Sequence, residues 1–351
     1  MKRIKISVSK EYEVVIGNKL LDESGALVRA VCPKSGTAAV ISDDNVAPLY
    51  LRRLTKSLES AGFSVVSFVF PHGEKSKNAE TYVEILNFLA ENRLTRTDLL
   101  VALGVGVVGD ITGFAAATYL RGVKFVQIPT SLLAMVDSSV GGKTAIDLKA
   151  GKNLAGAFCQ PELVVCDLDT LDTLSPAFFA DGCAEVIKYG VLADKALFEH
   201  LAERGQGFDG EYVIGRCVEL KRDYVTKDEF DTGVRMMLNL GHTVGHAIEK
   251  LSAYSISHGY AVAMGMGVVS RAAAAKGICS DRCAEAIEKG LEALKLPAAT
   301  AYTAKELIDP MLSDKKRAGG TVNLIVPYEI GRCGLLPTRV EELEDFVNTG
   351  L

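Results

Sequence analysis

The sequence lacks any run that approaches the roughly 18 uncharged apolar residues of a membrane span. Its opening segment, MKRIKISVSK, also lacks the apolar core of a secretory signal peptide. Both absences predict a cytoplasmic protein with no membrane association. The remaining composition is that of an ordinary globular protein, because 48% of the 351 residues are hydrophobic and 24% are charged. A chain of this length is long enough for two domains.

The patterns of a disulfide framework and of a nucleic-acid surface are also missing. None of the eight cysteines forms a C-x-x-C motif, so we expect reduced, packed thiols and no zinc knuckle. The net charge of -5 argues against binding to nucleic acid. Lysines and arginines nevertheless collect beside glycines in the middle of the chain, a pattern that favours small anions such as phosphate.

Strands and helices alternate over the first half of the chain. The apolar pattern predicts helices over 46–61 and 79–92 and strands over 4–8, 12–16, 37–42, 63–70, 98–103, 124–128 and 163–166. Strand, helix and strand at this spacing are typical of a parallel sheet covered by helices.

The pattern changes after Ser175 and Pro176, an N-cap followed by proline at the first helical position. From there it is helical and rich in alanine to about residue 295, and an apolar run over 322–326 predicts one late strand. The predicted fold class is therefore α/β plus α. We expect a Rossmann-like α/β domain with a mostly parallel sheet over 1–174 and a mainly α-helical domain over 175–351.

The stretch 233–251, GVRMMLNLGHTVGHAIEKL, predicts a single helix that is buried on nearly all sides. At about 100° per residue, one arc of about 60° holds its polar residues Arg235, Asn239, His242 and His246. A buried polar stripe needs partners. A divalent metal is one possibility, and a hydrogen-bonded structural histidine pair is the other. HTVGH lacks the glutamate of H-E-x-x-H, which argues against a zincin protease.

A G-x-G-x-x-G pattern begins at Gly104, directly after a predicted strand and before a predicted helix over 111–120. This context is typical of a dinucleotide pyrophosphate site. It follows the third strand of the alternating set, however, and no acidic residue lies about 20 residues further on. A turn that only lets helix and strand pack remains the alternative. Asp43 and Asn45 follow an earlier strand, where they could bind ribose hydroxyls or cap the next helix.

The segment VGGKT resembles the end of a P-loop, but Asp137 stands where that motif needs glycine, which disfavours Walker-type hydrolysis. Near it, glycine-rich loops carry Lys143, Lys152 and Asn153, which could bind an anion or be solvated. Later, the helical spacing of Asp181, Glu185 and Lys188 fits either a surface salt-bridge ladder or a carboxylate metal ligand.

Nine blocks between residues 42 and 327 together resemble the family of 3-dehydroquinate synthases, in family order and roughly family spacing. The blocks are SDDNVAPLYL, PHGEKSKN, VVGDITGFAAATYLRG, QIPTSLLAMVDSSVGGKTAID, GKNLAGAFCQP, AEVIKYG, RMMLNLGHTVGHAIE, HGYAVAMG and DKK. The resemblance implies a zinc or cobalt ion on Glu185, His242 and His258, with His246 as a catalytic contact to substrate or phosphate.

The resemblance also implies the remaining site residues. The NAD contacts would be Asp43, Asn45, Glu74, Lys77, Gly106, Asp110, Thr130, Ser131 and Thr173. The substrate contacts would be Arg121, Asp137, Lys143, Lys152, Asn153, Lys188, Lys221, Arg235, Asn239 and one or both of Lys315 and Lys316. Several fixed cations and amides of this kind suit a substrate that carries both a phosphate and a carboxylate.

The activity implied by the resemblance is the conversion of 3-deoxy-D-arabino-heptulosonate 7-phosphate to 3-dehydroquinate and phosphate, by a homodimer. Three alternatives compete with it. Another sugar-phosphate cyclase would close a different ring, a metal-dependent polyol dehydrogenase would release NADH, and a non-catalytic relative would only bind ligand.

Two positions depart from the family pattern. The turn that usually reads GGGVVGD has Val105 at its second glycine, and HGEAV here reads HGYAV, with Tyr260 in place of the acid. Because a β-branched side chain would crowd the pyrophosphate, we expect Val105 to weaken NAD binding by roughly tenfold. We expect Tyr260 to have only a small effect beside the metal site.

Overall fold

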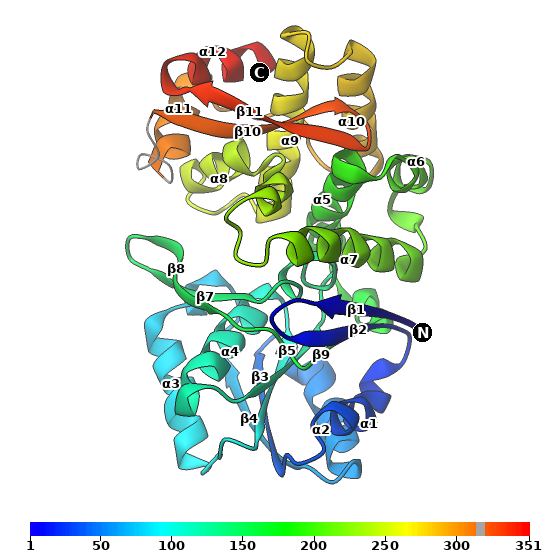
Figure 1. Ribbon diagram of the computed structural model, residues 1–351, viewed down its shortest axis with the longest axis vertical. Helices are drawn as coiled ribbons and strands as arrows, with labels where there is room; N and C mark the ends of the chain where they lie inside the picture. Colours follow the sequence, from blue (N-terminus) through cyan, green and yellow to red (C-terminus); the bar gives the residue numbers. More distant parts are fainter. Residues whose placement is uncertain (314–319) are drawn as a thin grey trace. The chain divides into compact units, whose positions relative to one another are not determined.

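The computed structural model describes residues 1–313 and 320–351, and Lys315 and Lys316 lie outside these residues (Figure 1). The chain divides into two compact units. The first comprises Met1–Leu174 and Gly210–Phe230, and the second comprises Ser175–Asp209 and Asp231–Leu351. No helix in the described part of the chain is long and apolar enough to cross a membrane.

A seven-stranded sheet forms the centre of the first unit, in the order β1-β2-β9-β6-β5-β3-β4. All neighbouring strands are parallel except β1 and β2. The strands are β1 (Lys2–Ser7), β2 (Glu11–Gly17), β3 (Thr37–Asp43), β4 (Ser64–Phe70), β5 (Leu99–Gly104), β6 (Lys124–Pro129) and β9 (Leu163–Asp167). The mostly parallel sheet confirms the predicted fold class.

Helices cover both faces of this sheet (Figure 1). Side chains alternate along each strand, so Val101 of β5 packs in one apolar cluster and Leu100 in the other. The first cluster contains residues of α1 (Leu20–Val31) and α2 (Ala47–Ser60). The second contains residues of α3 (Ala79–Glu91) and α4 (Gly106–Thr118). Burial on both faces explains why β5 reads as an uninterrupted apolar run.

The order of the strands reverses at β3, because β4 lies on one side of it and β5 on the other. In open α/β sheets, ligands bind outside the carboxyl ends of the strands at such a switch point. Helix α4 begins there, at Gly106, immediately after β5. The sequence placed the start of this helix at residue 111, which is wrong by more than one turn because the glycines themselves form its first turn.

The glycine-rich segment after β6 is also more regular than predicted. We expected loops, whereas the structure has a π-helix η3 (Ala134–Ser138) and an antiparallel hairpin of β7 (Lys143–Leu148) and β8 (Gly151–Phe158). Gly156 explains part of the error, because a Cβ there would lie 2.2 Å from the carbonyl oxygen of Thr144 on the opposite strand. The glycine therefore permits strand pairing and does not mark a loop.

The second unit is mainly helical, with one hairpin that includes the predicted late strand. Its elements are α5 (Pro176–Ala193), α6 (Lys195–Arg204), η5 (Gly205–Gly207), η6 (Val234–Asn239), α8 (His242–Leu251), α9 (His258–Ala275), α10 (Asp281–Ala293), α11 (Ala304–Ser313), β10 (Thr321–Glu329), β11 (Arg332–Arg339) and α12 (Val340–Gly350).

One helix from the second half of the sequence belongs to the first unit. Helix α7 (Gly210–Lys227) buries Val213 and Val218 and packs against β1, β2 and η3. The prediction of one uninterrupted domain over 175–351 is therefore wrong for this helix, because its buried face contacts strands at the other end of the chain. The first unit also contains the short helices η1 (Glu74–Ser76), η2 (Tyr119–Arg121) and η4 (Leu168–Thr173).

The predicted single helix over 233–251 is two helices, η6 and α8. The chain breaks at Gly241, which has a φ of 79° and whose Cβ would lie 2.6 Å from the carbonyl oxygen of Val262. A left-handed backbone and close contact with α9 both require glycine there. Arg235 on η6 is buried, whereas Asn239 and His246 are exposed. The expectation of burial on nearly all sides was therefore wrong.

Candidate active site

Three potential metal ligands come together in the second unit, each from a different helix. Glu185 lies in the middle of α5, whose start is fixed as predicted by Pro176 and by Ser175, which accepts a hydrogen bond from the Phe178 N–H. His242 is the first residue of α8, and His258 is the first residue of α9. Helix starts thus place both imidazoles beside the buried carboxylate.

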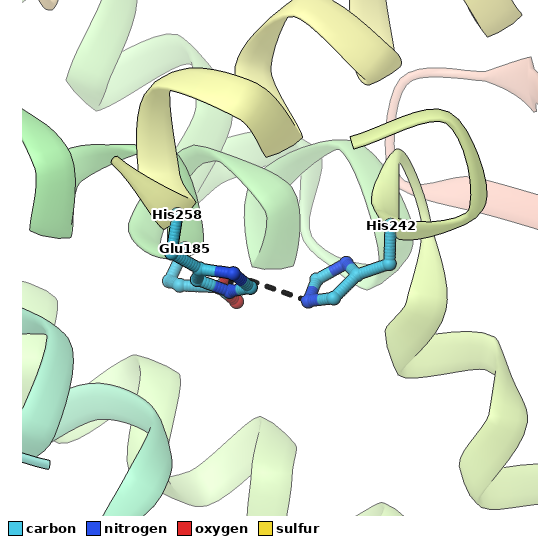
Figure 2. Close-up of side chains that lie close together, drawn as sticks. All are labelled: Glu185, His242 and His258. Atoms are coloured by element: carbon cyan, nitrogen blue, oxygen red, sulfur yellow. Dashed lines mark ion pairs between the residues drawn. The ribbon is translucent and has the colours of Figure 1, made fainter. Parts of the chain in front are cut away.

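The three side chains point toward one another (Figure 2). The Nε2 atoms of His242 and His258 lie 3.4 and 3.3 Å from the same oxygen, Oε1 of Glu185. Two ligand atoms bound to one tetrahedral zinc ion at 2.0–2.1 Å would lie about 3.3 Å apart. Because both imidazoles converge on one oxygen at this spacing, the arrangement fits a shared divalent cation.

Each imidazole is held at its second nitrogen by a different group. Nδ1 of His242 lies 3.1 Å from the carbonyl oxygen of Leu240, which can only accept a hydrogen bond. Nδ1 of His258 lies 3.3 Å from Oε2 of Glu249, a buried carboxylate on α8. Both contacts favour the tautomer whose Nε2 is free to bind a cation.

The pKa values of the two histidines are shifted in opposite directions. Burial favours the neutral form of His242 and lowers its pKa to about 3, against the attraction of Glu185. Burial acts in the same direction on His258, but the carboxylates of Glu185 and Glu249 outweigh it and raise the pKa to about 10. The two carboxylates thus stabilise positive charge at His258, and they would stabilise a bound cation in the same way.

The other oxygen of Glu185 is held by Lys188. The Lys188 ammonium forms a fully buried ion pair with Oε2 of Glu185, one turn further along α5. This contact directs Oε1 toward the imidazoles. The alternative of a surface salt-bridge ladder along this helix is wrong, because both side chains are buried.

Asp181, one turn before Glu185 on α5, fixes the start of α9. Its Oδ1 accepts hydrogen bonds from Ser257 Oγ at 2.5 Å and from the N–H groups of Gly259 and Tyr260 at 2.8 and 3.2 Å. A Cβ on Gly259 would lie 1.9 Å from the Asp181 carbonyl oxygen, so only glycine permits this approach. Asp181 therefore anchors the backbone of His258.

His246 lies beside the three-residue cluster without joining it. Its exposed ring has its centroid 5.4 Å from that of His242 and 6.0 Å from that of His258. With Glu249 and His258 it forms a second group of donors whose ligand atoms lie within 4.8 Å of one another.

In the first unit, Lys77 joins several of the residues predicted to contact NAD and substrate. Its buried ammonium donates hydrogen bonds of 2.6 Å to Oδ2 of Asp110 and to Oδ1 of Asn153. The N–H of Asn153 in turn donates to Asp147 Oδ1. Burial disfavours the ammonium charge, but Asp110 and Glu74 more than compensate and raise the pKa of Lys77. These contacts connect η1, α4 and β8.

A second ion pair connects α7 with η3. The ammonium of Lys221 donates to Oδ1 of Asp137 at 2.9 Å and to the Asp137 carbonyl oxygen at 2.6 Å. Lys143 lies at the start of β7 with an exposed side chain, and Lys152 on β8 forms a looser ion pair of 3.7 Å with Glu74. Lys77 and Lys221 are thus held in ion pairs, whereas Lys143 and Lys152 lie near opposite ends of the β7–β8 hairpin.

Arg121 lies apart from the other predicted contacts of the first unit. It lies in η2, before the amino end of β6, whereas Thr130 follows the carboxyl end of the same strand. The backbone oxygen of Leu120 contacts Arg96, which precedes β5. Within the first unit, Arg121 is therefore at the opposite edge of the sheet from the predicted NAD contacts.

The glycine turn after β5 has the geometry expected for a helix start. Val105 is the N-cap of α4 with an extended backbone (φ -80°, ψ -176°), and its side chain caps no N–H group. A Cβ on Gly109 would lie 2.7 Å from Oε1 of Gln127 on β6, so this glycine permits close packing of helix and strand. Gly106 is the first residue of α4.

Neighbouring strand ends carry further predicted NAD contacts. Oδ1 of Asp43 accepts hydrogen bonds from the N–H groups of Asn45 and Val46, so this carboxylate caps the turn into α2. Burial raises the pKa of Asp43. The hydroxyl of Thr173 lies 2.5 Å from that of Tyr50.

Two functional candidates were not identified from the sequence. Glu249 was not considered, although it lies two turns after His242 on the same face of α8. Asp181 was noted only as a member of a ladder or as a metal ligand. Its contact with the start of α9 has no signal in the local sequence, because it depends on how two helices pack.

Family models match most of the chain. The model described as "3-dehydroquinate synthase N-terminal" matches residues 67–181, and the one described as "3-dehydroquinate synthase C-terminal" matches residues 182–317. The 3-dehydroquinate synthase of Streptococcus suis (strain 05ZYH33) is 41% identical to the chain over 343 residues, covering 96% of each sequence. These matches confirm the resemblance inferred from the nine sequence blocks.

Solved structures of related enzymes share the fold. A 2-deoxy-scyllo-inosose synthase, complexed with carbaglucose-6-phosphate, NAD+ and Co2+, matches with a TM-score of 0.90 at 22% identity over 100% of both chains. ValA, a 2-epi-5-epi-valiolone synthase from Streptomyces hygroscopicus subsp. jinggangensis 5008 with NAD+ and Zn2+ bound, matches with a TM-score of 0.89 at 25% identity over 99% of both chains.

Proposed function

Since this chain belongs to the 3-dehydroquinate synthase family, we propose that it converts 3-deoxy-D-arabino-heptulosonate 7-phosphate to 3-dehydroquinate and phosphate. The reaction proceeds by transient oxidation of a hydroxyl, elimination of phosphate, reduction, ring opening and intramolecular aldol closure. The observation that carries the proposal is the convergence of Glu185, His242 and His258 in a chain of this family.

We propose that Glu185, His242 and His258 hold the divalent metal, zinc or cobalt. The donor set of one carboxylate and two imidazoles, with 3.3 and 3.4 Å between the donor atoms, supports this assignment. Three protein ligands leave coordination positions for substrate oxygens. When bound, the ion would lower the pKa of the hydroxyl to be oxidised.

We place NAD at the carboxyl ends of β3 and β5, with its pyrophosphate at the start of α4. Three observations support this site. It is the switch point of the sheet, the α4 N-terminus has no side-chain cap, and Thr130 Oγ1 is buried with no hydrogen-bond partner among the described residues. The bound cofactor would accept a hydride and return it within one turnover.

The chain's own residues then bind and orient the substrate. In this proposal Lys143, Lys152 and Lys221 bind its phosphate and carboxylate, since ammonium groups form charge-assisted hydrogen bonds with anionic oxygens. Asp137 and Asn153 accept hydrogen bonds from its hydroxyls. Arg235, Asn239 and His246 are further proposed contacts of the substrate. No residue is needed as a nucleophile, because orientation and charge stabilisation account for the chemistry.

A homodimer is also part of the proposal. Arg121 supports it, because this residue lies at the opposite edge of the sheet from the other predicted contacts of the first unit. In a dimer, Arg121 would reach the substrate of the other chain. Analytical ultracentrifugation would test the assembly, and a monomer at enzyme assay concentrations would contradict it.

The central test is release of phosphate from the heptulosonate phosphate by metal-loaded protein, with and without catalytic NAD. We expect release only with both cofactors, loss of activity when a chelator removes the metal, and restoration by zinc or cobalt. Absorbance at 340 nm should not accumulate, because the hydride returns to the substrate. Steady accumulation would instead indicate a polyol dehydrogenase. Another sugar-phosphate cyclase would leave this substrate unchanged.

A further inference from the structure

We propose that Glu249 is a positioning residue for the metal site, which holds His258 by its Nδ1 atom so that Nε2 is directed at Glu185 and the metal. The inference rests on the proposed function of this site. Neither the sequence motifs nor the family match assigns a role to this carboxylate.

The position of Glu249 is unusual for a glutamate. Glu249 is only 5% exposed, and it lies on α8 two turns after His242. A buried carboxylate is costly unless it is paired, so the contact of 3.3 Å between its Oε2 and Nδ1 of His258 is significant. A single helix thus carries one metal ligand and the support for another.

The chemistry of imidazole explains why an acceptor is needed at this nitrogen. A neutral imidazole carries one proton, and the nitrogen that binds a metal must be the one without it. If Nε2 of His258 faces the metal, Nδ1 carries the proton and needs an acceptor. Glu249 supplies this acceptor, as the carbonyl oxygen of Leu240 does for His242.

Backbone contacts alone would not fix the ring. Asp181 holds the N–H groups of Gly259 and Tyr260, which anchors the start of α9 but leaves the side chain of His258 free to rotate. The His258 side chain is 33% exposed, compared with 12% for His242, so packing restrains it less. A side-chain acceptor is therefore more important for His258 than for His242.

A second cation bound by His246, Glu249 and His258 is the competing interpretation of the same contacts. With both sites filled, the ring of His258 would have to lose both of its protons. A hydrogen bond from Nδ1 requires no such step, so Glu249 acts as a hydrogen-bond acceptor and not as a ligand of a second cation.

The test compares Glu249→Ala, Glu249→Asp and Glu249→Gln with the wild-type chain. Zinc affinity is measured by competition with a chelator, and the ligand geometry by the absorption spectrum of the cobalt form. We expect Glu249→Ala and Glu249→Asp to lose about 10- to 100-fold in affinity, since the acceptor is missing or too short. Glu249→Gln keeps an amide oxygen at the same place and should stay within about fivefold of the wild type, with a similar cobalt spectrum.

The matched control is Asp98→Asn in the first unit. Asp98 is also a buried carboxylate, and it accepts hydrogen bonds from the backbone of Thr37 and Thr95. Its replacement should lower thermal stability and leave zinc affinity unchanged. If Glu249 were merely structural, zinc affinity in its variants would instead remain at the wild-type value, as in this control.

Three results would overturn the assignment. The first is wild-type zinc affinity and an unchanged cobalt spectrum in Glu249→Asp, which decides the matter even if Glu249→Ala does not fold. The second is a loss of affinity in Glu249→Gln as large as in Glu249→Ala. The third is binding of two zinc ions per chain, one of which is lost in all three variants, because Glu249 would then be a ligand. Phosphate release by metal-free wild type would contradict the proposed function without changing these affinities.

Discussion

The polar groups of the two units are arranged in opposite ways. In the first unit, cations and anions are paired, as in the contacts of Lys77 with Asp110 and of Lys221 with Asp137. In the second unit, Lys188 pairs with Oε2 of Glu185, but two imidazoles converge on the other oxygen of this carboxylate. Paired charges stabilise each other without a ligand, whereas converging bases need a proton or a metal between them. We therefore expect the first unit to depend on its ion pairs for stability and the second to depend on a cation for function.

Removal of one of the converging bases should have the largest effect on metal binding. We expect His242→Ala to lose more than about 100-fold in zinc affinity, beyond the 10- to 100-fold typical of a supporting residue. His246→Ala should stay within about tenfold and show a lower kcat, because His246 lies beside the cluster and would contact substrate. Chelator competition and phosphate release measure the two effects. Equal loss of zinc in both variants would show that the ligands have been assigned incorrectly.

Removal of a paired charge should act on stability instead. Breaking a buried ion pair typically costs about 3–5 kcal/mol, and Asp110 is 19% exposed, so we expect Lys77→Ala to lower the free energy of unfolding by about 2–3 kcal/mol. Zinc affinity should not change. The control is Lys152→Ala, because its ion pair with Glu74 spans 3.7 Å between partly exposed side chains and should contribute less than about 1 kcal/mol.

Urea unfolding of both variants gives the measurement. If Lys77→Ala and Lys152→Ala are equally stable, Lys77 is not the structural centre of its cluster. A lower zinc affinity in Lys77→Ala would show that the stability of the first unit and metal binding are coupled, contrary to the comparison.

The sequence predicted the fold best where the apolar residues of a segment recur with the period of a strand or of a helix. The strands of the parallel sheet and helices α2 and α3 lie within a few residues of their predicted positions. The errors occur where glycine has a tertiary role. Gly241 ends a helix where the backbone of α9 approaches closely, and Gly156 permits the pairing of β7 with β8. In neither case does the local sequence reveal that another backbone segment lies nearby.

The same limit applies to the site. The family resemblance named Glu185, His242 and His258, and the structure brings them together from three helices. Spacing alone would have missed this set, because it grouped His242 with His246, which are four residues apart in the sequence. The supports, Asp181 and Glu249, went unrecognised because each acts on a residue of another helix.

Tyr260 tests how far the metal site depends on its surroundings. Its N–H is held by Asp181, and this contact does not involve the side chain. We therefore expect Tyr260→Glu to retain zinc and to change turnover by less than about tenfold, or about 1.4 kcal/mol. Zinc affinity and kcat should be measured together. Loss of zinc would show that the phenol ring is part of the packing that holds His258.

Val105→Gly should have the smallest effect of these substitutions. The structure lowers the gain in NAD affinity that is expected from it. The sequence suggested a gain in NAD affinity of roughly tenfold, on the assumption that valine distorts the turn or displaces the cofactor. The backbone at Val105 is extended, a conformation that valine adopts without strain. The turn therefore need not move when the side chain is removed, and we expect Val105→Gly to tighten NAD binding by no more than about threefold.

A second substitution, Val105→Thr, tests whether the start of α4 binds the pyrophosphate because no side chain caps it. Valine cannot cap α4, so the N–H groups of the first turn depend on no side chain and remain suited to a pyrophosphate. Threonine has nearly the same shape, but its hydroxyl can accept from those N–H groups. Val105→Thr should therefore raise stability by about 1 kcal/mol and weaken NAD binding, because the cap competes with the anion. Calorimetric titration of NAD into the zinc-loaded variants distinguishes the cases. A gain of tenfold or more in Val105→Gly would mean that the valine side chain collides with the cofactor, and unchanged affinity in Val105→Thr would mean that the pyrophosphate does not bind at this helix start.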